Sequence, residues 1–168
     1  MVIVRRIVAA VVVALALTGC YGPDPNLTEA GEGKPFVTVQ FPAEVQSGSV
    51  HTAVVEIENP GPGDMSRVSV TFSIVGQGTA EGGIPPAIVP LGAAGENEAI
   101  SDVRPEPVAV SQDGIVYVFD GIDEGATKTI EFEIRVTGPP GPAANAVIVS
   151  DAEDVERARG TRMETTIE

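Results

Sequence analysis

Hydrophobic and polar residues alternate with a period of two along most of the chain after residue 36. The alternating segments are 37–41, 53–57, 68–74, 130–136 and, near the end, 163–167. Such alternation is typical of antiparallel strands that bury one face in a core and leave the other face in water. Two more segments, 115–119 and 146–149, are apolar at almost every position, and we predict that both faces of these strands are covered.

Residues that favour turns separate these segments. Glycine, proline, serine, asparagine and aspartate gather at 47–48, 59–63, 113–114, 123–125 and 138–141. Short strands divided by such turns predict an all-β sandwich or barrel. The polar segment 151–159 has Val155 as its only large apolar residue, and we interpret it as a loop with at most one helical turn.

The segment from Gly76 to Asp113 departs from the alternating pattern. It contains five prolines and six glycines, with short apolar pieces at 88–89 and 108–110. A structureless stretch of this length is uncommon in a compact domain, and proline is tolerated at the edges of sheets. We therefore predict one or two short edge strands here, and we consider the segment a place where a binding loop could lie.

A basic pair, an apolar run and a cysteine motif stand at the start of the chain. Arg5 and Arg6 precede the apolar residues 7–17, and the motif is Leu17-Thr18-Gly19-Cys20. The run would form about 17 Å of helix, which is too short for the roughly 30 Å of a bilayer core, so it reads as a secretory signal. The motif resembles the lipobox of bacterial lipoproteins. That resemblance implies loss of residues 1–19 and attachment of diacylglycerol and palmitate to Cys20.

The remaining chain divides into a tether and one domain. Residues 20–35 are rich in proline, glycine and acids without an apolar period, and we expect a flexible tether with a reach of about 20 Å. Residues 36–168 are long enough to build one hydrophobic core. Cys20 is the only cysteine, so no disulfide within the chain can stabilise that core.

The charge of the chain is strongly negative. The net charge of −14 falls to −16 when the signal and its two arginines are removed. Binding to nucleic acid depends on lysine and arginine neutralising phosphates, so we predict no nucleic-acid partner. The same charge disfavours a protein surface lying flat on anionic lipid. Without tryptophan and with 4% aromatic residues, the chain lacks the stacking rings typical of carbohydrate binding.

Three spaced motifs are similar to a family of bacterial surface domains. They are Asn59-Pro60-Gly61 after a strand, Ile122-Asp123-Glu124-Gly125 before a long strand, and Asn145-Ala146-Val147-Ile148-Val149 followed by Asp151. They resemble the immunoglobulin-like repeats of bacterial surface proteins, a domain-of-unknown-function family related to the cell-adhesion-related bacterial domain. The resemblance implies a single immunoglobulin-like antiparallel β-sandwich of about seven to nine strands. At the turns, we interpret Asn59 as a residue that tolerates a left-handed conformation, and Gly61 and Gly125 as residues with positive φ.

Signatures of catalysis are missing from the sequence. It has no Gly-x-Ser-x-Gly elbow, no His-Glu-x-x-His helix and no glycine-rich phosphate loop. His51, the only histidine, could act as a base or a metal ligand, and Ser47 or Ser49 could act as a nucleophile beside it. We interpret all three as polar residues at a turn and a strand start, and we predict no enzyme activity and no cofactor.

Acidic residues supply the remaining candidate chemistry. Asp113, Asp120, Asp123 and Glu124 could converge on calcium, which prefers oxygen ligands. Asp151, Glu153 and Asp154 form a second acidic group. Neither has the spacing of a calcium loop, and a chain of this charge gathers such groups by chance, so we predict solvated loops without a metal.

The sequence therefore favours a non-catalytic module on the extracytoplasmic side of the cell membrane. Its role would be adhesion, envelope assembly or protein–protein interaction. Its partners would be the membrane, through lipid at Cys20, and another envelope or surface protein. The alternative is a ligand-binding or accessory subunit of a membrane complex, which a large apolar pocket or an exposed apolar patch near residues 76–113 would favour. An enzyme is the third possibility, and a cluster of His51 with two carboxylates would support it.

Overall fold

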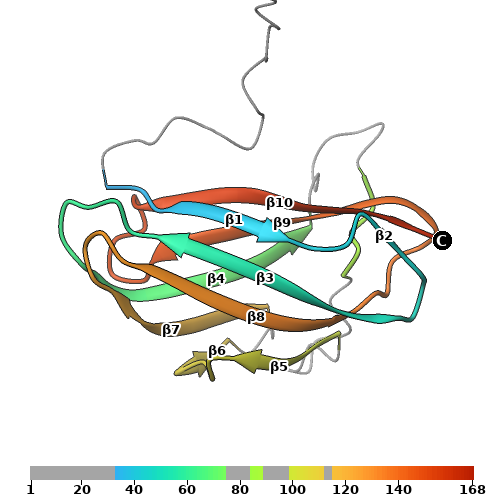
Figure 1. The fold of residues 1–168 in the computed structure, drawn as a ribbon, viewed down its shortest axis with the longest axis horizontal. Coiled ribbons are helices and arrows are strands. Elements are labelled where there is room, and N and C mark those ends of the chain that lie inside the picture. Colours follow the sequence, from blue (N-terminus) through green and yellow to red (C-terminus); the bar gives the residue numbers. More distant parts are fainter. Residues whose placement is uncertain (1–32, 75–83, 89–98, 112–114) are drawn as a thin grey trace, which may run out of the picture.

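The computed structural model describes residues 33–74, 84–88, 99–111 and 115–168, and the described part folds as two β-sheets face to face (Figure 1). The signal segment and Cys20 lie outside the described residues. The strands are β1 (Phe36–Gln40), β2 (Glu44–Val45), β3 (Val50–Glu58), β4 (Met65–Ile74), β5 (Ile100–Arg104), β6 (Ala109–Val110), β7 (Val116–Ile122), β8 (Thr127–Arg135), β9 (Gly141–Asp151) and β10 (Ala158–Ile167). The predicted all-β sandwich is confirmed, with ten strands because β2 and β6, each of two residues, add to the longer ones.

One sheet has four strands in the order β1-β3-β8-β5, and the other has six in the order β2-β10-β9-β4-β7-β6. All neighbours are antiparallel except β2 and β10, which run parallel. The prediction of a purely antiparallel sandwich is wrong at this pair. The parallel pair arises because the chain leaves β1 at the edge of the four-stranded sheet and continues into β2 at the edge of the six-stranded sheet.

The other side of the sandwich is closed in the same way. Strand β5 forms the edge of the four-stranded sheet, and β6 forms the edge of the six-stranded sheet. Both lie in the segment that predicted one or two short edge strands, and the prediction is confirmed. Short edge strands limit pairing with foreign chains. The predicted turn at 113–114 and much of the segment 76–113 lie outside the described residues.

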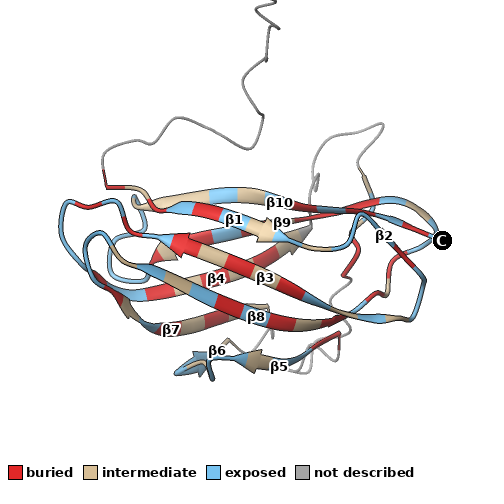
Figure 2. Cartoon of the chain, in the orientation of Figure 1, coloured by how far each residue is buried: buried red, intermediate tan, exposed pale blue. Residues whose placement is uncertain are grey.

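The core lies between the sheets and follows the alternation read from the sequence (Figure 2). Phe132 on β8 is fully buried at its centre, in edge-to-face contact with Phe72, Tyr117 and Phe119 of the opposite sheet. Its ring centroid is 4.9 Å from that of Phe72. Burial raises the pKa of Tyr117 to about 12.

The segments 115–119 and 146–149 are not covered on both faces as predicted, and Val116 and Val118 point outward with part of their surface exposed. Val147 and Val149 are fully buried, but Ile148 points outward and keeps 37% of its surface exposed. The run is continuously apolar, yet it belongs to a strand with one uncovered face. The loop predicted at 151–159 is confirmed for residues 152–157, which contain a turn, whereas Asp151 ends β9 and Ala158 and Arg159 begin β10.

Candidate functional site

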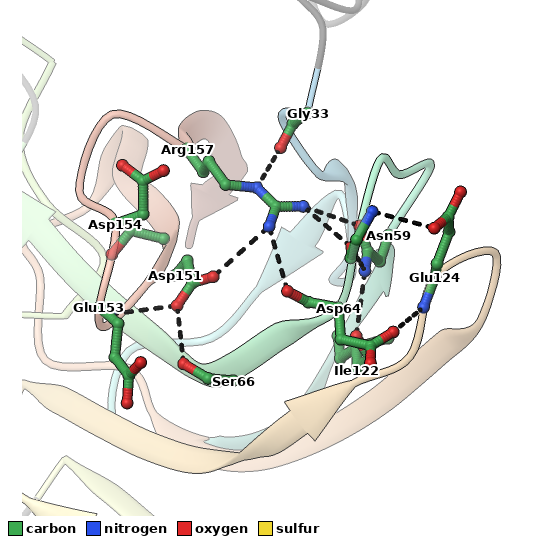
Figure 3. Close-up of polar contacts among 12 residues, drawn as sticks. Gly33, Asn59, Asp64, Ser66, Ile122, Glu124, Asp151, Glu153, Asp154 and Arg157 are labelled. Carbon is green, nitrogen blue, oxygen red and sulfur yellow. Dashed lines mark hydrogen bonds and ion pairs between the residues drawn. The ribbon is translucent and has the colours of Figure 1, made fainter.

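The densest polar cluster lies at one end of the sandwich and is built around Asn59, which follows β3 (Figure 3). Asn59 is fully buried, and its side-chain amide donates to the carbonyls of Gly63 and Ile122, both at 3.0 Å. Its side-chain oxygen accepts from the Gly61 amide at 3.2 Å and from Arg157 at 3.0 Å. The whole hydrogen-bonding capacity of the side chain is therefore used.

The sequence interpretation of Asn59 is wrong in its mechanism. The positive-φ residues of this turn are Gly61 and Gly63, with φ of 83° and 81°, whereas Asn59 is not one of them. Asn59 acts through its side chain, which bridges the β3–β4 turn to the end of β7. The interpretation of the glycines is confirmed, since Gly125 also has a positive φ of 74°. A side chain at Gly61 would in addition collide with Glu124.

Arg157, in the β9–β10 loop, completes this cluster, and the sequence analysis did not single it out. Its side chain is 15% exposed, and its guanidinium reaches acceptors in three separate segments. Those acceptors are the carbonyls of Gly33 (2.6 Å), Asp64 (3.2 Å) and Gly63 (3.5 Å), Asn59 Oδ1 (3.0 Å) and the Asp151 carboxylate (3.6 Å). Four of these contacts are hydrogen bonds, and the fifth, with Asp151, is an ion pair. A basic residue within the acidic segment 151–159 was the signal that could have revealed it.

Asp151 supports the same cluster from the end of β9. It is 4% exposed, and one carboxylate oxygen accepts from the Glu153 amide at 3.1 Å and from the Ser66 hydroxyl at 3.4 Å. The other oxygen faces Arg157. Of the second acidic group, Asp151 is thus a structural partner of Arg157, while Glu153 and Asp154 are exposed at the surface of the loop.

The structure uses part of the calcium candidate set for other contacts. The Glu124 carboxylate accepts from the Gly63 amide at 2.9 Å, while Asp120 and Asp123 are exposed. Asp113 lies outside the described residues. Within the described ranges, no three histidine, cysteine, aspartate or glutamate side chains are placed to hold a metal ion.

The opposite end of the sandwich carries His51, at the start of β3. The Ser49 hydroxyl lies 2.5 Å from the Gln46 carbonyl and 2.8 Å from His51 Nε2. A carbonyl oxygen only accepts, so the single hydroxyl hydrogen of Ser49 belongs to the Gln46 contact, and His51 Nε2–H donates to Ser49. A base that activates serine must accept its proton, and this arrangement is the reverse. Ser47 is exposed and bonds through its backbone to Glu168.

Two open depressions lie near this end. One, of about 340 Å³, is lined by Glu44, Val45, Gln46, Ser49, His51 and Glu168. The other, of about 280 Å³, lies beside the ends of β9 and β10. Both volumes are near or below the lower limit of small-molecule sites, which are usually apolar and enclosed.

A second buried asparagine, Asn145, holds the segment 84–88 to the six-stranded sheet. Its side-chain oxygen accepts from the Ile88 amide at 2.9 Å, and its amide donates to the Ile88 carbonyl at 3.1 Å. The sequence analysis placed Asn145 in a strand motif but did not predict this bridge. Like Asn59, it replaces backbone pairing where a strand ladder ends.

No protein-family model and no curated protein matches the sequence. Among solved structures, the chain is similar to PapD-like domain 7 of human CEP192, with 14% identity, a TM-score of 0.40, and 92% of this chain and 95% of that chain covered. It is also similar to the bacterial hydrophobin BslA, with 8% identity, a TM-score of 0.48, and coverage of 84% and 98%. A third similarity is to a cohesin module from a Clostridium perfringens family 33 glycoside hydrolase, with 15% identity, a TM-score of 0.42, and coverage of 83% and 98%.

A search of the described residues for a helix long and apolar enough to cross a membrane finds none. At one end of the sandwich, the polar side chains are hydrogen-bonded to one another. At the other end, polar side chains line open depressions. His51 lines its depression together with Glu44 and Glu168, the two carboxylates that an active-site interpretation would need, but among the described residues neither carboxylate is hydrogen-bonded to His51.

Proposed function

We propose that the chain is a non-catalytic, lipid-anchored module that presents an immunoglobulin-like sandwich on the extracytoplasmic side of the cell membrane. The observation that carries the non-catalytic part is the position of the Ser49 hydroxyl, which lies 2.5 Å from the Gln46 carbonyl and 2.8 Å from His51 Nε2. A hydroxyl that donates to the carbonyl has no second proton to give to His51.

The anchoring part of the proposal is supported by the sequence at Leu17-Thr18-Gly19-Cys20. The tether after Cys20 leads to Gly33, whose carbonyl Arg157 binds at 2.6 Å. Arg157 thereby ties the start of the domain to the β9–β10 loop. A pulling force on the anchor would therefore act on the domain through this contact, and would not act first to separate β1 from β3.

The proposed role is protein–protein interaction in adhesion or envelope assembly, with another envelope or surface protein as partner. The family resemblance of the Asn59, Gly125 and Asn145 motifs supports it, because that family comprises surface repeats. The polar groups of the Arg157 cluster are occupied by one another, so the outer faces of the sheets and the His51 end are the surfaces left for contact with a partner.

The experiment is fractionation of cells that express the full chain, with intact mass analysis of the mature protein. We expect the wild type in the membrane fraction with a lipid mass addition, and Cys20→Ser in the soluble or secreted fraction. Tyr21→Ser, at the neighbouring position, is the matched control and should remain anchored. If Cys20→Ser keeps both membrane retention and the added mass, the anchoring proposal is wrong.

A further inference from the structure

The two outer faces of the sandwich differ sharply in charge. On the four-stranded sheet, the charged residues at the outward positions of β3 and β8 are four glutamates and one arginine, namely Glu56, Glu58, Glu131, Glu133 and Arg135. On the six-stranded sheet, two adjacent rows of outward residues are small or apolar and contain no charge. The rows are Ala158, Ser150, Ser69, Val118 and Ala109, and Gly160, Ile148, Thr71 and Val116. We call these two rows the uncharged face.

The uncharged face is suited to losing its water. Ile148 lies at its centre with 37% of its surface exposed. The Ser69 and Ser150 hydroxyls lie 2.7 Å apart and bond to each other, so a covering surface would not leave them unpaired. Gly160, paired with Ile148 across the strands, has no side chain to cover it.

The rims of this face carry balanced charge. Arg67 on β4 lies opposite Asp120 on β7 at one limit of the rows. Arg162 and Glu164 on β10 form an exposed ion pair of 3.5 Å at the other limit. Two copies that meet here bring no net charge together, whereas the glutamates of the other sheet would repel.

We propose that the uncharged face is the surface through which two copies of this chain associate side by side on a membrane, an inference that rests on the lipid anchor proposed above. A two-fold interface uses the same patch on both copies and so requires a patch that tolerates itself. In a chain with a net charge of −14, this face meets that condition.

The uncharged face is too small to hold two free domains together stably. From strand spacings of about 4.8 Å, the face with its rims covers roughly 500 Å² per copy. The total of about 1,000 Å² is below the roughly 1,600 Å² of a standard stable interface. Free domains would therefore associate weakly, and confinement to a membrane would supply the effective concentration that the contact needs.

The anchor also sets the orientation of the pair. Gly33, where the described domain begins, lies at the Arg157 end of the sandwich (Figure 3). Two chains anchored in one membrane have these ends on the same side, so the two-fold axis runs along the strands. Each row then faces the same row of the partner, and the row of Ile148 and Thr71 meets itself.

Cross-linking of the full chain in intact cells tests the proposal. A lipidated Cys20 has no free thiol, so Thr71→Cys introduces one thiol on the uncharged face. Val54→Cys introduces one on the outer face of the four-stranded sheet and is the matched control, because both positions are half-buried. With a short bismaleimide, we expect at least tenfold more dimer for Thr71→Cys, of a mass equal to two chains. Equal yields, or Thr71→Cys linked to a different protein, would overturn the proposal.

A second substitution tests the contact itself. Ile148→Lys in the Thr71→Cys chain should lower the dimer yield to that of Val54→Cys, whereas Ile148→Val should keep it. Should Ile148→Lys lower the melting temperature below that of growth, Arg162→Glu replaces it, because this side chain is 54% exposed and its change makes the rim acidic. Arg162→Glu should lower the yield several-fold, and an unchanged yield would contradict the proposal.

The same samples separate this proposal from that of the anchor. A chain that is soluble and has no lipid mass refutes the anchor. A chain that is anchored but gives equal yields at Thr71 and Val54 refutes the association alone.

Discussion

The two ends of the sandwich are closed by different means. At the Arg157 end, buried polar side chains from three loops and the start of the domain bond to one another, and their hydrogen-bonding capacity is filled. At the His51 end, short backbone contacts join the loops, and the side chains of Ser49 and His51 border an open depression. The comparison teaches that polar residues in loops stabilise strongly only where they are buried and fully paired.

Among the substitutions that test this difference between the two ends, Arg157→Ala should lower the free energy of unfolding most. It leaves the carboxylate of Asp151 and the side-chain oxygen of Asn59 without their cation, and loss of one partner of a buried ion pair costs about 3–5 kcal/mol. Urea denaturation of the soluble domain measures the free energy of unfolding. The matched control is Arg162→Ala, on the exposed face of β10, with an expected loss within about 0.5 kcal/mol. Equal losses for the two arginines would mean that the Arg157 cluster does not close its end.

Asn59→Ala should have the next largest effect. It removes the donor to the buried Ile122 carbonyl and leaves the Gly63 carbonyl with Arg157 alone, with an expected loss of about 2–3 kcal/mol in the same urea measurement. Glu58→Gln, at the exposed neighbouring position, should change stability by no more than about 0.5 kcal/mol. A small loss for Asn59→Ala would indicate that water replaces the amide and that this end is open.

Tyr117 reports on the core between the two ends. Its pKa is raised by burial to about 12, above the ordinary value of 10, so its contribution to stability is complete below pH 10 and is lost as the pH rises toward 12. The loss amounts to about 2 kcal/mol. Ultraviolet titration should show Tyr117 ionising near pH 12, and this step should be absent in Tyr117→Phe. A single step near pH 10 would show that the core admits water at Tyr117.

Ser49→Ala and His51→Ala should have small effects at the open end. Ser49→Ala removes the hydroxyl contacts with Gln46 and His51, and His51→Ala removes the second of these. The positions are partly exposed, so we expect losses of about 0.5–1 kcal/mol in the free energy of unfolding, the larger for Ser49→Ala. His51→Gln, which can still donate to Ser49, should lose less than His51→Ala. Losses as large as that of Arg157→Ala would show that the two ends stabilise the fold equally.

The strands could be predicted from the sequence because a half-buried strand repeats every second residue. Phe72 and Phe132 face inward as their patterns require, and Gly61 and Gly125 take the positive φ that tight turns need. Ile148 was misjudged because an apolar run does not show which face the fold leaves uncovered. The partners of Arg157 could not be predicted, since they come from Gly33, the β3–β4 turn and β9, and only the folded chain brings these segments together.

Calcium should produce the smallest effect of all. The Arg157 end holds several acidic candidates, but Glu124 already binds the Gly63 amide, so a metal site there would have to displace that contact. A site filled at a hundredfold excess over its Kd would stabilise the fold by about 2.7 kcal/mol, a shift of several degrees in the melting temperature. We expect no shift that is specific to calcium. The measurement compares calcium with magnesium at equal ionic strength, because screening of the negative charge would raise the melting temperature with either ion. A shift with calcium alone that disappears in the Asp120→Asn/Asp123→Asn variant would identify a site, and it would make the Arg157 end a ligand site as well as a structural closure.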